Sequence, residues 1–177
     1  MTHGNEEILE SSYAWVELLT YIIARKRYNR TLKTTYENFI TKYRQNKIIG
    51  HWIEEALMET YMIATENQGW AKIAFTYGIK ALKTLSDIKE EDLTSENYVT
   101  LIKHVISKAG DSDTNAAIVG GLVGAVLGFK RLPENYLFKQ FRLELNDQDY
   151  KCSHRGPFYE PKRQFYKAMK LVEKFYE

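Results

Sequence analysis

The chain has 177 residues, of which 44% are hydrophobic and 27% charged, and its formal net charge is +2. These values exclude an intrinsically disordered protein, which has fewer apolar residues and a larger net charge. The single cysteine excludes a disulfide scaffold and a cysteine-only zinc site, and the small net charge does not favour a nucleic-acid partner.

The N-terminus and the apolar segments indicate a cytoplasmic protein. Residues 1–7 lack the basic start and the apolar stretch of a signal peptide. The longest apolar run, Ala116 to Phe129, has 14 residues, whereas a helix that spans a bilayer needs about 20. We therefore expect a cytoplasmic protein without a membrane partner, and the reducing compartment suits the lone Cys152.

Apolar residues recur at helical spacing along almost the whole chain, and no segment shows the alternation of a strand. The predicted helices, in chain order, are Glu6 to Arg27, Leu32 to Tyr43, Trp52 to Ile63, Ala71 to Leu85 (after an interruption at Gly69), one capped by Thr94 or Ser95, Thr114 to Gly128, a short one at Pro133, and Gln164 to Tyr176. The segment from Asn146 to Pro161 is rich in turn formers and predicts a loop. The expected fold class is all-α, an orthogonal bundle of about seven to eight helices.

Basic residues are concentrated between Arg25 and Lys47, where Glu37 is the only acidic side chain. One interpretation is a surface for an anionic partner, in which case the protein would be a helical interaction module that binds RNA or DNA. The other interpretation is a solvated pair of helices, which the modest net charge favours.

A dense group of oxygen donors follows Gly110. Asp111, Ser112, Asp113 and Thr114 are consecutive, and a glycine-rich helix is predicted to begin there. One carboxylate at such a place is explained by the positive end of the helix dipole. The whole group suits a hard cation such as Mg²⁺ or Ca²⁺ better than zinc. An EF-hand loop is excluded, because Ala116 and Leu122 occupy the positions that need Gly and Glu.

Small residues line one stripe of the helix that follows. Ala116, Gly120, Gly124 and Gly128 are four apart. Each helical glycine costs about 1 kcal/mol relative to alanine, so this stripe predicts close approach to neighbouring helices. We expect that packing to hold the two aspartates inside the protein.

Together these segments resemble a known family. The run from Ala109 to Ala117, continued by Gly120, Gly121, Gly124, Ala125 and Gly128, is similar to the C-terminal signature of the ADP-ribosylglycohydrolases of the dinitrogenase-reductase-activating type. The following Arg131-Leu132-Pro133 and Tyr136-Leu137 fit the family's continuation. Thr2-His3-Gly4 resembles a Thr-His element of the family, and Gly50-His51-Trp52-Ile53 resembles its Gly-aromatic helix start.

The resemblance implies a two-Mg²⁺ hydrolase that cleaves the glycosidic bond between ADP-ribose and an acceptor, with ADP-ribose or an ADP-ribosylated protein as its partner. Asp111, Asp113 and Thr114 match the family's C-terminal magnesium ligands. His3 matches a histidine near the bound ADP-ribose, and Gly50 and His51 fall where the family approaches the nucleoside.

The match also departs from the family pattern. Ala109 stands where the family has the first glycine of a pair. The Gly-Asp and Thr-Asp-Asp-Thr elements, which supply the remaining ligands and the acid/base carboxylate, have no counterpart, so the catalytic residue is unknown. We therefore expect residues 1–145 to be the C-terminal portion of the family domain, and residues 146–177 to be an unmatched extension.

This expectation leaves two interpretations of the function open. In the first, the chain is a fragment or one part of a split enzyme, inactive by itself, and a second chain supplies the N-terminal half. In the second, it is a catalytically inactive module that binds ADP-ribose or acts as a scaffold.

Overall fold

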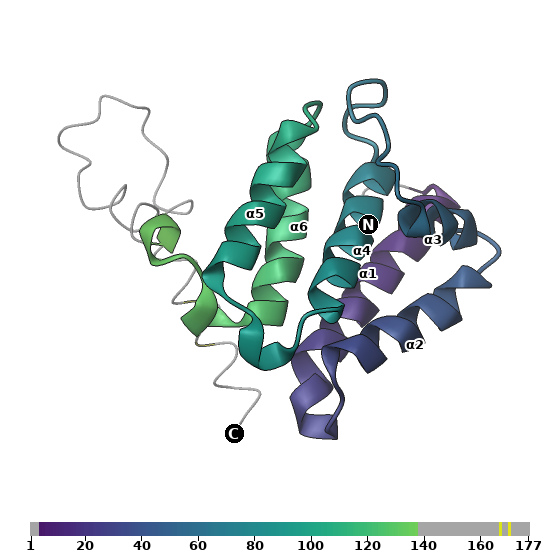
Figure 1. Cartoon of the computed structure of the whole chain (residues 1–177). Coiled ribbons are helices and arrows are strands. Elements are labelled where there is room, and N and C mark those ends of the chain that lie inside the picture. The colour runs from purple at the N-terminus through teal and green to yellow at the C-terminus, as the bar shows by residue number, and fades with distance from the viewer. Residues whose placement is uncertain (1–3, 138–166, 168–169, 171–177) are drawn as a thin grey trace, which may run out of the picture. The chain divides into compact units, whose positions relative to one another are not determined.

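The computed structural model describes residues 4–137, 167 and 170. The chain divides into two units, Met1–Leu132 and Pro133–Glu177, and each is described by itself. The first unit holds six α-helices, namely α1 (Glu6–Ala24), α2 (Leu32–Arg44), α3 (Gly50–Leu57), α4 (Ala71–Ser86), α5 (Ser95–Ser107) and α6 (Ser112–Leu127). Three short 3₁₀ helices, η1 (Arg25–Tyr28), η2 (Glu90–Asp92) and η3 (Phe129–Arg131), connect or follow them. The described residues contain no strand, and the predicted all-α class is confirmed (Figure 1).

Helix α4 is the central element of the first unit. All its residues from Lys72 to Leu82 are buried, because α3 and α6 pack against it together with α1, α2 and α5. Its polar face is therefore inside the protein and needs partners there. Lys72 donates to Glu55 at 2.5 Å, and the Tyr77 hydroxyl donates to the Met62 carbonyl at 2.7 Å.

Local capping explains where several helices begin. Asn5 Oδ1 accepts hydrogen bonds from the amides of Glu7 and Ile8 at the start of α1. Thr31 Oγ1 accepts from the Thr34 amide at the start of α2. At the start of α5 the Thr94 amide donates to Asn97 Oδ1 at 2.7 Å. These contacts satisfy amides that the first helical turn leaves without partners.

Helix α3 is shorter than the sequence predicts. The apolar spacing extends it to Ile63, but the helix ends at Leu57 and Met58 is extended. The reason is tertiary, because side chains of α4 bind the carbonyls of the following segment. Lys80 donates to the Met58 carbonyl, and Tyr77 donates to that of Met62. Residues 58–70 therefore form a loop, here called the α3–α4 loop.

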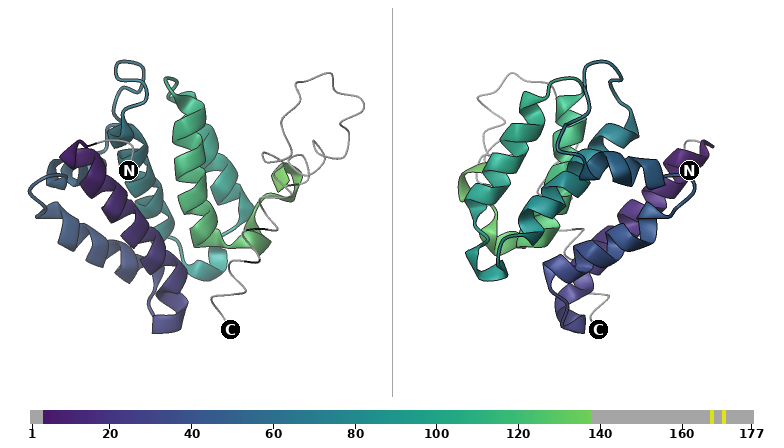
Figure 2. Two further views of the ribbon diagram at one scale, coloured as in Figure 1. Left: turned by 180° about the vertical axis from the view of Figure 1, so that it is seen from behind. Right: turned by 45° about the vertical axis from the view of Figure 1, so that its right-hand side comes forward.

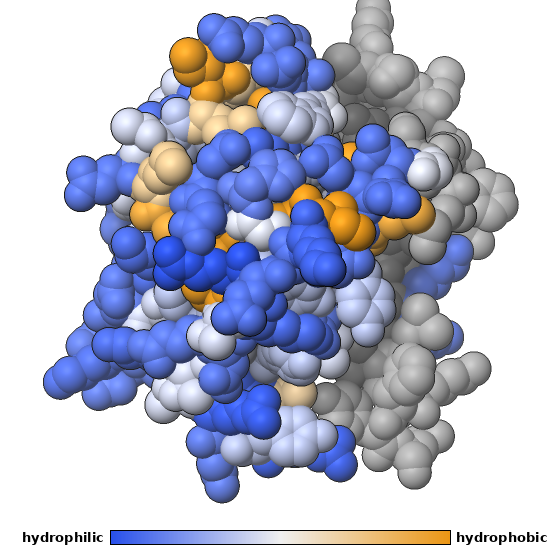
Figure 3. Space-filling model, turned by 90° about the vertical axis from the view of Figure 1, so that its right-hand side faces the viewer, coloured by the Kyte–Doolittle hydropathy of each residue, from blue (hydrophilic) through white to orange (hydrophobic). Residues whose placement is uncertain are grey.

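Other groups of the protein bind three residues of the basic segment, Arg25, Lys42 and Arg44. Arg25 is buried, and its guanidinium donates to the carbonyls of Ile22 and Val126. Lys42 pairs with Glu17 at 2.7 Å, and Arg44 pairs with Glu54 at 2.5 Å. The view of the molecule from the right-hand side of Figure 1 is largely hydrophilic, with small scattered apolar areas (Figure 3).

The second unit is described over a short stretch. Residues 134–137 are helical, and the Pro133 carbonyl accepts from the amides of Tyr136 and Leu137, which agrees with the predicted short helix. Lys167 and Lys170 are also helical, within the segment predicted as the last helix. The predicted loop from Asn146 to Pro161 and Cys152 lie outside the described residues. Within the described part of the chain, no helix has the length and apolar character that crossing a membrane requires.

Candidate functional site

The turn between α5 and α6 is built from two consecutive residues with left-handed backbones. Ala109 has φ 58° and Gly110 has φ 67°. After them the Asn115 amide donates to the Asp111 carbonyl at 3.0 Å, which begins α6. A left-handed conformation is unfavourable for alanine and readily adopted by glycine. A glycine at position 109 would adopt this conformation more readily, and Ala109 keeps it at some cost in stability.

Tertiary packing places the α3–α4 loop against this turn. A Cβ on Gly110 would overlap the carbonyl of Ala64, which is itself buried. Further along the loop, a Cβ on Gly69 would lie 3.8 Å from Asp111 Oδ2. The two segments consequently lie side by side at one end of the first unit, as both Figure 1 and Figure 2 show.

The predicted magnesium ligands are gathered at the first turn of α6, residues 111–114, here called the acidic turn. Asp111 is half-buried, whereas Asp113 and Thr114 are exposed. The Thr114 backbone amide, followed by the neighbouring Asp111 carboxyl, lowers the pKa of Asp113 below its ordinary value. Both carboxylates thus stand at the positive end of the helix. The expectation that both aspartates lie inside the protein is wrong, because α6 begins at the surface.

The glycine stripe is only partly explained by close packing. A Cβ on Gly120 would be 3.0 Å from the Tyr98 hydroxyl of α5, a tight contact that a larger side chain could make only if Tyr98 shifted by a few tenths of an ångström. At Gly124 the nearest atom would be Leu132 Cδ2 at 3.7 Å, an ordinary contact. A Cβ on Gly121 or Gly128 would meet no atom within 4 Å, although the φ of Gly128 is 76°. The prediction that the whole stripe approaches its neighbours closely is wrong.

Gly50 and His51 lie at the start of α3. Gly50 is buried, and a Cβ there would be 2.7 Å from the Arg44 carbonyl oxygen, so packing against the end of α2 requires glycine. His51 is exposed, and its Nε2 lies 3.5 Å from Glu7 Oε1 at the start of α1. His3 lies outside the described residues.

Two tryptophans connect the start of α3 with the α3–α4 loop. The rings of Trp52 and Trp70 meet edge to face, with centroids 6.3 Å apart. Trp52 is fully buried, and its Nε1 has no hydrogen-bond partner. Since Gly69 precedes Trp70 and lies beside Asp111, a chain of contacts leads from His51 to the acidic turn.

The α3–α4 loop contributes site residues that the sequence did not single out. Asn67, Gln68, Gly69 and Trp70 line a cavity of about 410 Å³. The one sequence signal was the predicted break at Gly69, which the structure confirms as a turn with φ 79°. No residue pattern within the loop indicates that it reaches the turn between α5 and α6, some 40 residues further along the chain.

The donors at the start of α6 suit part of a magnesium shell. Two carboxylates and one hydroxyl are the hard oxygen ligands that Mg²⁺ prefers. Among residues 4–137, 167 and 170, however, no group of three or more His, Cys, Asp or Glu side chains is placed to hold a metal ion. The described turn therefore fits the metal only as one part of a larger ligand set.

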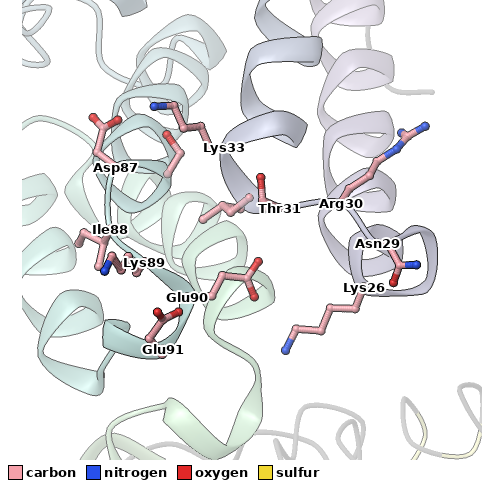
Figure 4. A pocket seen from close by; sticks show the side chains of 12 residues that line it. Lys26, Asn29, Arg30, Thr31, Lys33, Asp87, Ile88, Lys89, Glu90 and Glu91 are labelled. Atoms are coloured by element: carbon pink, nitrogen blue, oxygen red, sulfur yellow. The ribbon is translucent and has the colours of Figure 1, made fainter.

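A larger cavity, of about 720 Å³, lies between the η1–α2 connection and the α4–α5 connection. Lys26, Arg30 and Lys33 line it from the first connection, and Asp87, Glu90 and Glu91 from the second (Figure 4). Arg25 places the first connection beside the C-terminal half of α6, through its bond to the Val126 carbonyl. This cavity is therefore remote from the acidic turn, which begins the same helix.

The fold and the acidic turn define a helical protein with an oxygen-rich helix start. The chain belongs to the ADP-ribosylglycohydrolase family, whose family model matches residues 1–154. This family consists of metal-dependent glycosyl hydrolases that act on ADP-ribosylated substrates. No curated protein and no solved structure gives a significant match to the chain. The resemblance inferred from the sequence is confirmed at the level of the family.

Proposed function

We propose that the protein takes part in the Mg²⁺-dependent hydrolysis of the bond between ADP-ribose and an acceptor, as a cytoplasmic member of the dinitrogenase-reductase-activating type. The observation that carries this proposal is the gathering of Asp111, Asp113 and Thr114 at the first turn of α6, in a chain that the family model matches over residues 1–154. Asp113 is ionised at neutral pH, because its pKa lies below the ordinary value.

Each part of the site has a proposed role. Asp111, Asp113 and Thr114 would hold Mg²⁺ through their oxygens, and a bound Mg²⁺ supplies an activated water and orients the ribose. Gly69 lies next to the Asp111 carboxylate, since a Cβ on Gly69 would be 3.8 Å from Asp111 Oδ2. His51 and Gly50 at the start of α3, together with His3, are the proposed substrate-binding residues.

The described residues supply too few anionic ligands for two magnesium ions. A pair of magnesium ions needs several carboxylates, and the turn offers two. We propose that the remaining ligands and the acid/base carboxylate come from the other part of the family domain, either in a longer polypeptide of which these residues are a piece or in a second chain. On this proposal the 177-residue chain binds Mg²⁺ weakly and shows no turnover by itself.

Titration calorimetry with MgCl₂ and ADP-ribose tests the proposal. Replacing Asp113 by Asn should weaken Mg²⁺ binding by at least about tenfold, because a charged ligand is lost. Asp87→Asn, an exposed carboxylate that lines the remote cavity, is the matched control and should leave the affinity unchanged. If Asp113→Asn and Asp87→Asn bind Mg²⁺ as the natural chain does, the metal role of the turn is wrong. Hydrolysis of an ADP-ribosylated substrate by the chain alone would contradict its incompleteness.

A catalytically inactive ADP-ribose-binding or scaffold module is the second candidate. It is favoured by the lack of a three-residue metal-binding group among the described residues. This candidate predicts that ADP-ribose binds equally well with MgCl₂ and with EDTA. It also predicts that Asp113→Ala leaves the affinity for ADP-ribose unchanged, whereas the hydrolase proposal predicts a loss in both experiments.

A further inference from the structure

Tyr61 is the residue at which the α3–α4 loop meets two helices. The centroid of its ring lies 5.1 Å from that of Tyr77 on α4 and 4.6 Å from that of His104 on α5. The ammonium groups of Lys80 on α4 and of Lys108, which follows α5, lie 5.0 Å and 4.7 Å from the same centroid. One aromatic ring of the loop therefore contacts four side chains of the helical scaffold.

The same stretch of the loop packs on the turn before α6. Ala64, three residues after Tyr61, is buried, and its carbonyl leaves no room for a side chain at Gly110. Between these two loop residues, the Met62 carbonyl accepts from the Tyr77 hydroxyl at 2.7 Å. Because protein interiors are close-packed and transmit strain, a displacement of Tyr61 reaches Ala64 and through it the backbone of Gly110.

His104 makes its contact with Tyr61 as a neutral ring. Its Nε2 is buried and has no hydrogen-bond partner, and burial first, then Lys108, lower its pKa below 6.5. A protonated imidazole is a donor at both nitrogens. The buried Nε2 would then carry a hydrogen without an acceptor, which is unfavourable. The charged ring is therefore disfavoured at the place where His104 lies.

The charged groups around His104 oppose a further positive charge. Lys80 and Lys108 lie on the same aromatic ring, and neither forms an ion pair within the described part of the chain. The carboxylates of the loop, Glu59 and Glu66, are exposed. Helix α6 also packs on α5, but its carboxylates stand at the acidic turn. A proton on His104 thus places a third cation at this ring, and repulsion adds to the cost of the buried N–H.

We infer that protonation of His104 opens this contact, so that the charged ring turns towards the solvent, Tyr61 leaves its place, and the α3–α4 loop moves away from the acidic turn. We call the contact of Tyr61 with Tyr77, Lys80, His104 and Lys108 the Tyr61 latch. The latch is closed at neutral pH and opens in mild acid, which is the range in which histidine changes its charge.

The latch makes the candidate site responsive to pH. Residues 67–70, which line the smaller cavity, belong to the same loop, and Gly69 lies beside Asp111. Opening of the latch separates this loop from the acidic turn and relaxes the backbone that positions Asp111 and Asp113. Mg²⁺ should then bind less tightly. This effect on Mg²⁺ rests on the proposed magnesium role of the acidic turn, whereas the opening itself does not.

An NMR titration of the full chain between about pH 7.5 and pH 5 tests the latch. We expect the amide signals of Ala64 and Gly110 to shift with the same midpoint as the His104 ring. His104→Gln should abolish this midpoint, and Lys108→Gln should raise it, because a neighbouring positive charge is removed. Lys103→Gln, at an exposed lysine of α5, is the matched control and should leave the midpoint unchanged.

Tyr61→Leu separates the latch from a direct effect of His104 on its own helix. In this variant the His104 ring should still titrate, but the signals of Ala64 and Gly110 should no longer follow it. Circular dichroism checks that the variant keeps the native helix content. The proposal is overturned if the two amides do not respond to His104 in the natural chain, or if they respond equally in Tyr61→Leu.

Titration calorimetry with MgCl₂ at about pH 7.5 and pH 5.5 tests the effect on the site. Between these two values the loss of Mg²⁺ affinity should be at least about twofold larger for the natural chain than for His104→Gln. An equal loss in both proteins overturns the influence of the latch on the metal. If Asp113→Asn binds Mg²⁺ as tightly as the natural chain at the higher pH, the proposed function fails, and the NMR titration still decides whether the latch exists.

Discussion

The carboxylate of Asp111 lies against Gly69, so that a Cβ on Gly69 would come within 3.8 Å of Asp111 Oδ2. The two residues belong to segments that are remote in the sequence, and their meeting brings the α3–α4 loop to the acidic turn. The loop is held there by Gly110, against which Ala64 packs without room for a side chain. The shape of the candidate site therefore depends on backbone conformation at the turn as much as on the carboxylates.

Ala109 is expected to limit the stability of the turn. Its φ of 58° is unfavourable for a residue with a Cβ. Ala109→Gly should raise the free energy of unfolding by about 1 kcal/mol, measured by urea denaturation. The control is Ala117→Gly at an exposed position within α6, which should lower the same free energy by about 1 kcal/mol. Equal effects of the two substitutions would contradict the role of the left-handed backbone.

Gly110 is expected to tolerate no side chain. Gly110→Ala should lower the free energy of unfolding by about 2 kcal/mol or more, because the left-handed φ and the overlap with the Ala64 carbonyl act together. Gly124→Ala is the comparison, since its Cβ would make an ordinary 3.7 Å contact in a regular helix. It should be neutral or stabilising by up to about 1 kcal/mol. Urea denaturation of both variants measures these changes in the free energy of unfolding. A Gly110→Ala variant as stable as the natural chain would refute the close contact.

Arg25 is expected to be a main structural link of the first unit. Its buried guanidinium binds the carbonyls of Ile22 and Val126, and it reaches Glu90 at 3.3 Å. Arg25→Ala should cost about 3 kcal/mol, because two carbonyls and a carboxylate lose their partner. Glu90→Gln should cost less, since the two carbonyl contacts remain. Thermal and urea unfolding measure the loss of stability in each variant. A larger loss for Glu90→Gln than for Arg25→Ala would show that the ion pair outweighs the carbonyl contacts.

His104 is expected to make stability depend on pH. Burial first, and the nearby Lys108 second, lower the pKa of His104 below 6.5, and its Nε2 is buried without a hydrogen-bond partner. The folded chain therefore binds this proton less readily than the unfolded chain. The contribution of neutral His104 is complete above pH 6.5 and declines as the pH falls below 6.5 towards the lowered pKa.

The comparison of the natural chain with His104→Gln isolates this effect. The difference in unfolding free energy between the two proteins should shift against the natural chain as the pH falls below 6.5. An NMR titration of the His104 ring supplies the pKa directly. A ring that titrates above 6.5, or a difference that moves in the opposite direction, would contradict the prediction.

The sequence by itself determined most of the local structure of this protein. Apolar residues at helical spacing predicted the all-α class, and caps such as Thr31 and Thr94 mark helix starts through contacts within one turn. The consecutive oxygen donors from Asp111 to Thr114 pointed to the acidic turn, and the residues around them indicated the family. These features depend on neighbours along the chain, so they can be inferred from residue order.

The tertiary structure decided what distant segments do to one another. It ended α3 at Leu57, because Lys80 and Tyr77 of α4 bind carbonyls of the segment that follows. It buried Arg25 out of the basic segment, and it placed Gly69 beside Asp111. It also distinguished Gly120, which packs tightly against the Tyr98 hydroxyl, from Gly121, where a Cβ would meet no atom within 4 Å. Such outcomes follow from the packing of side chains in space, which spacing along the chain does not encode.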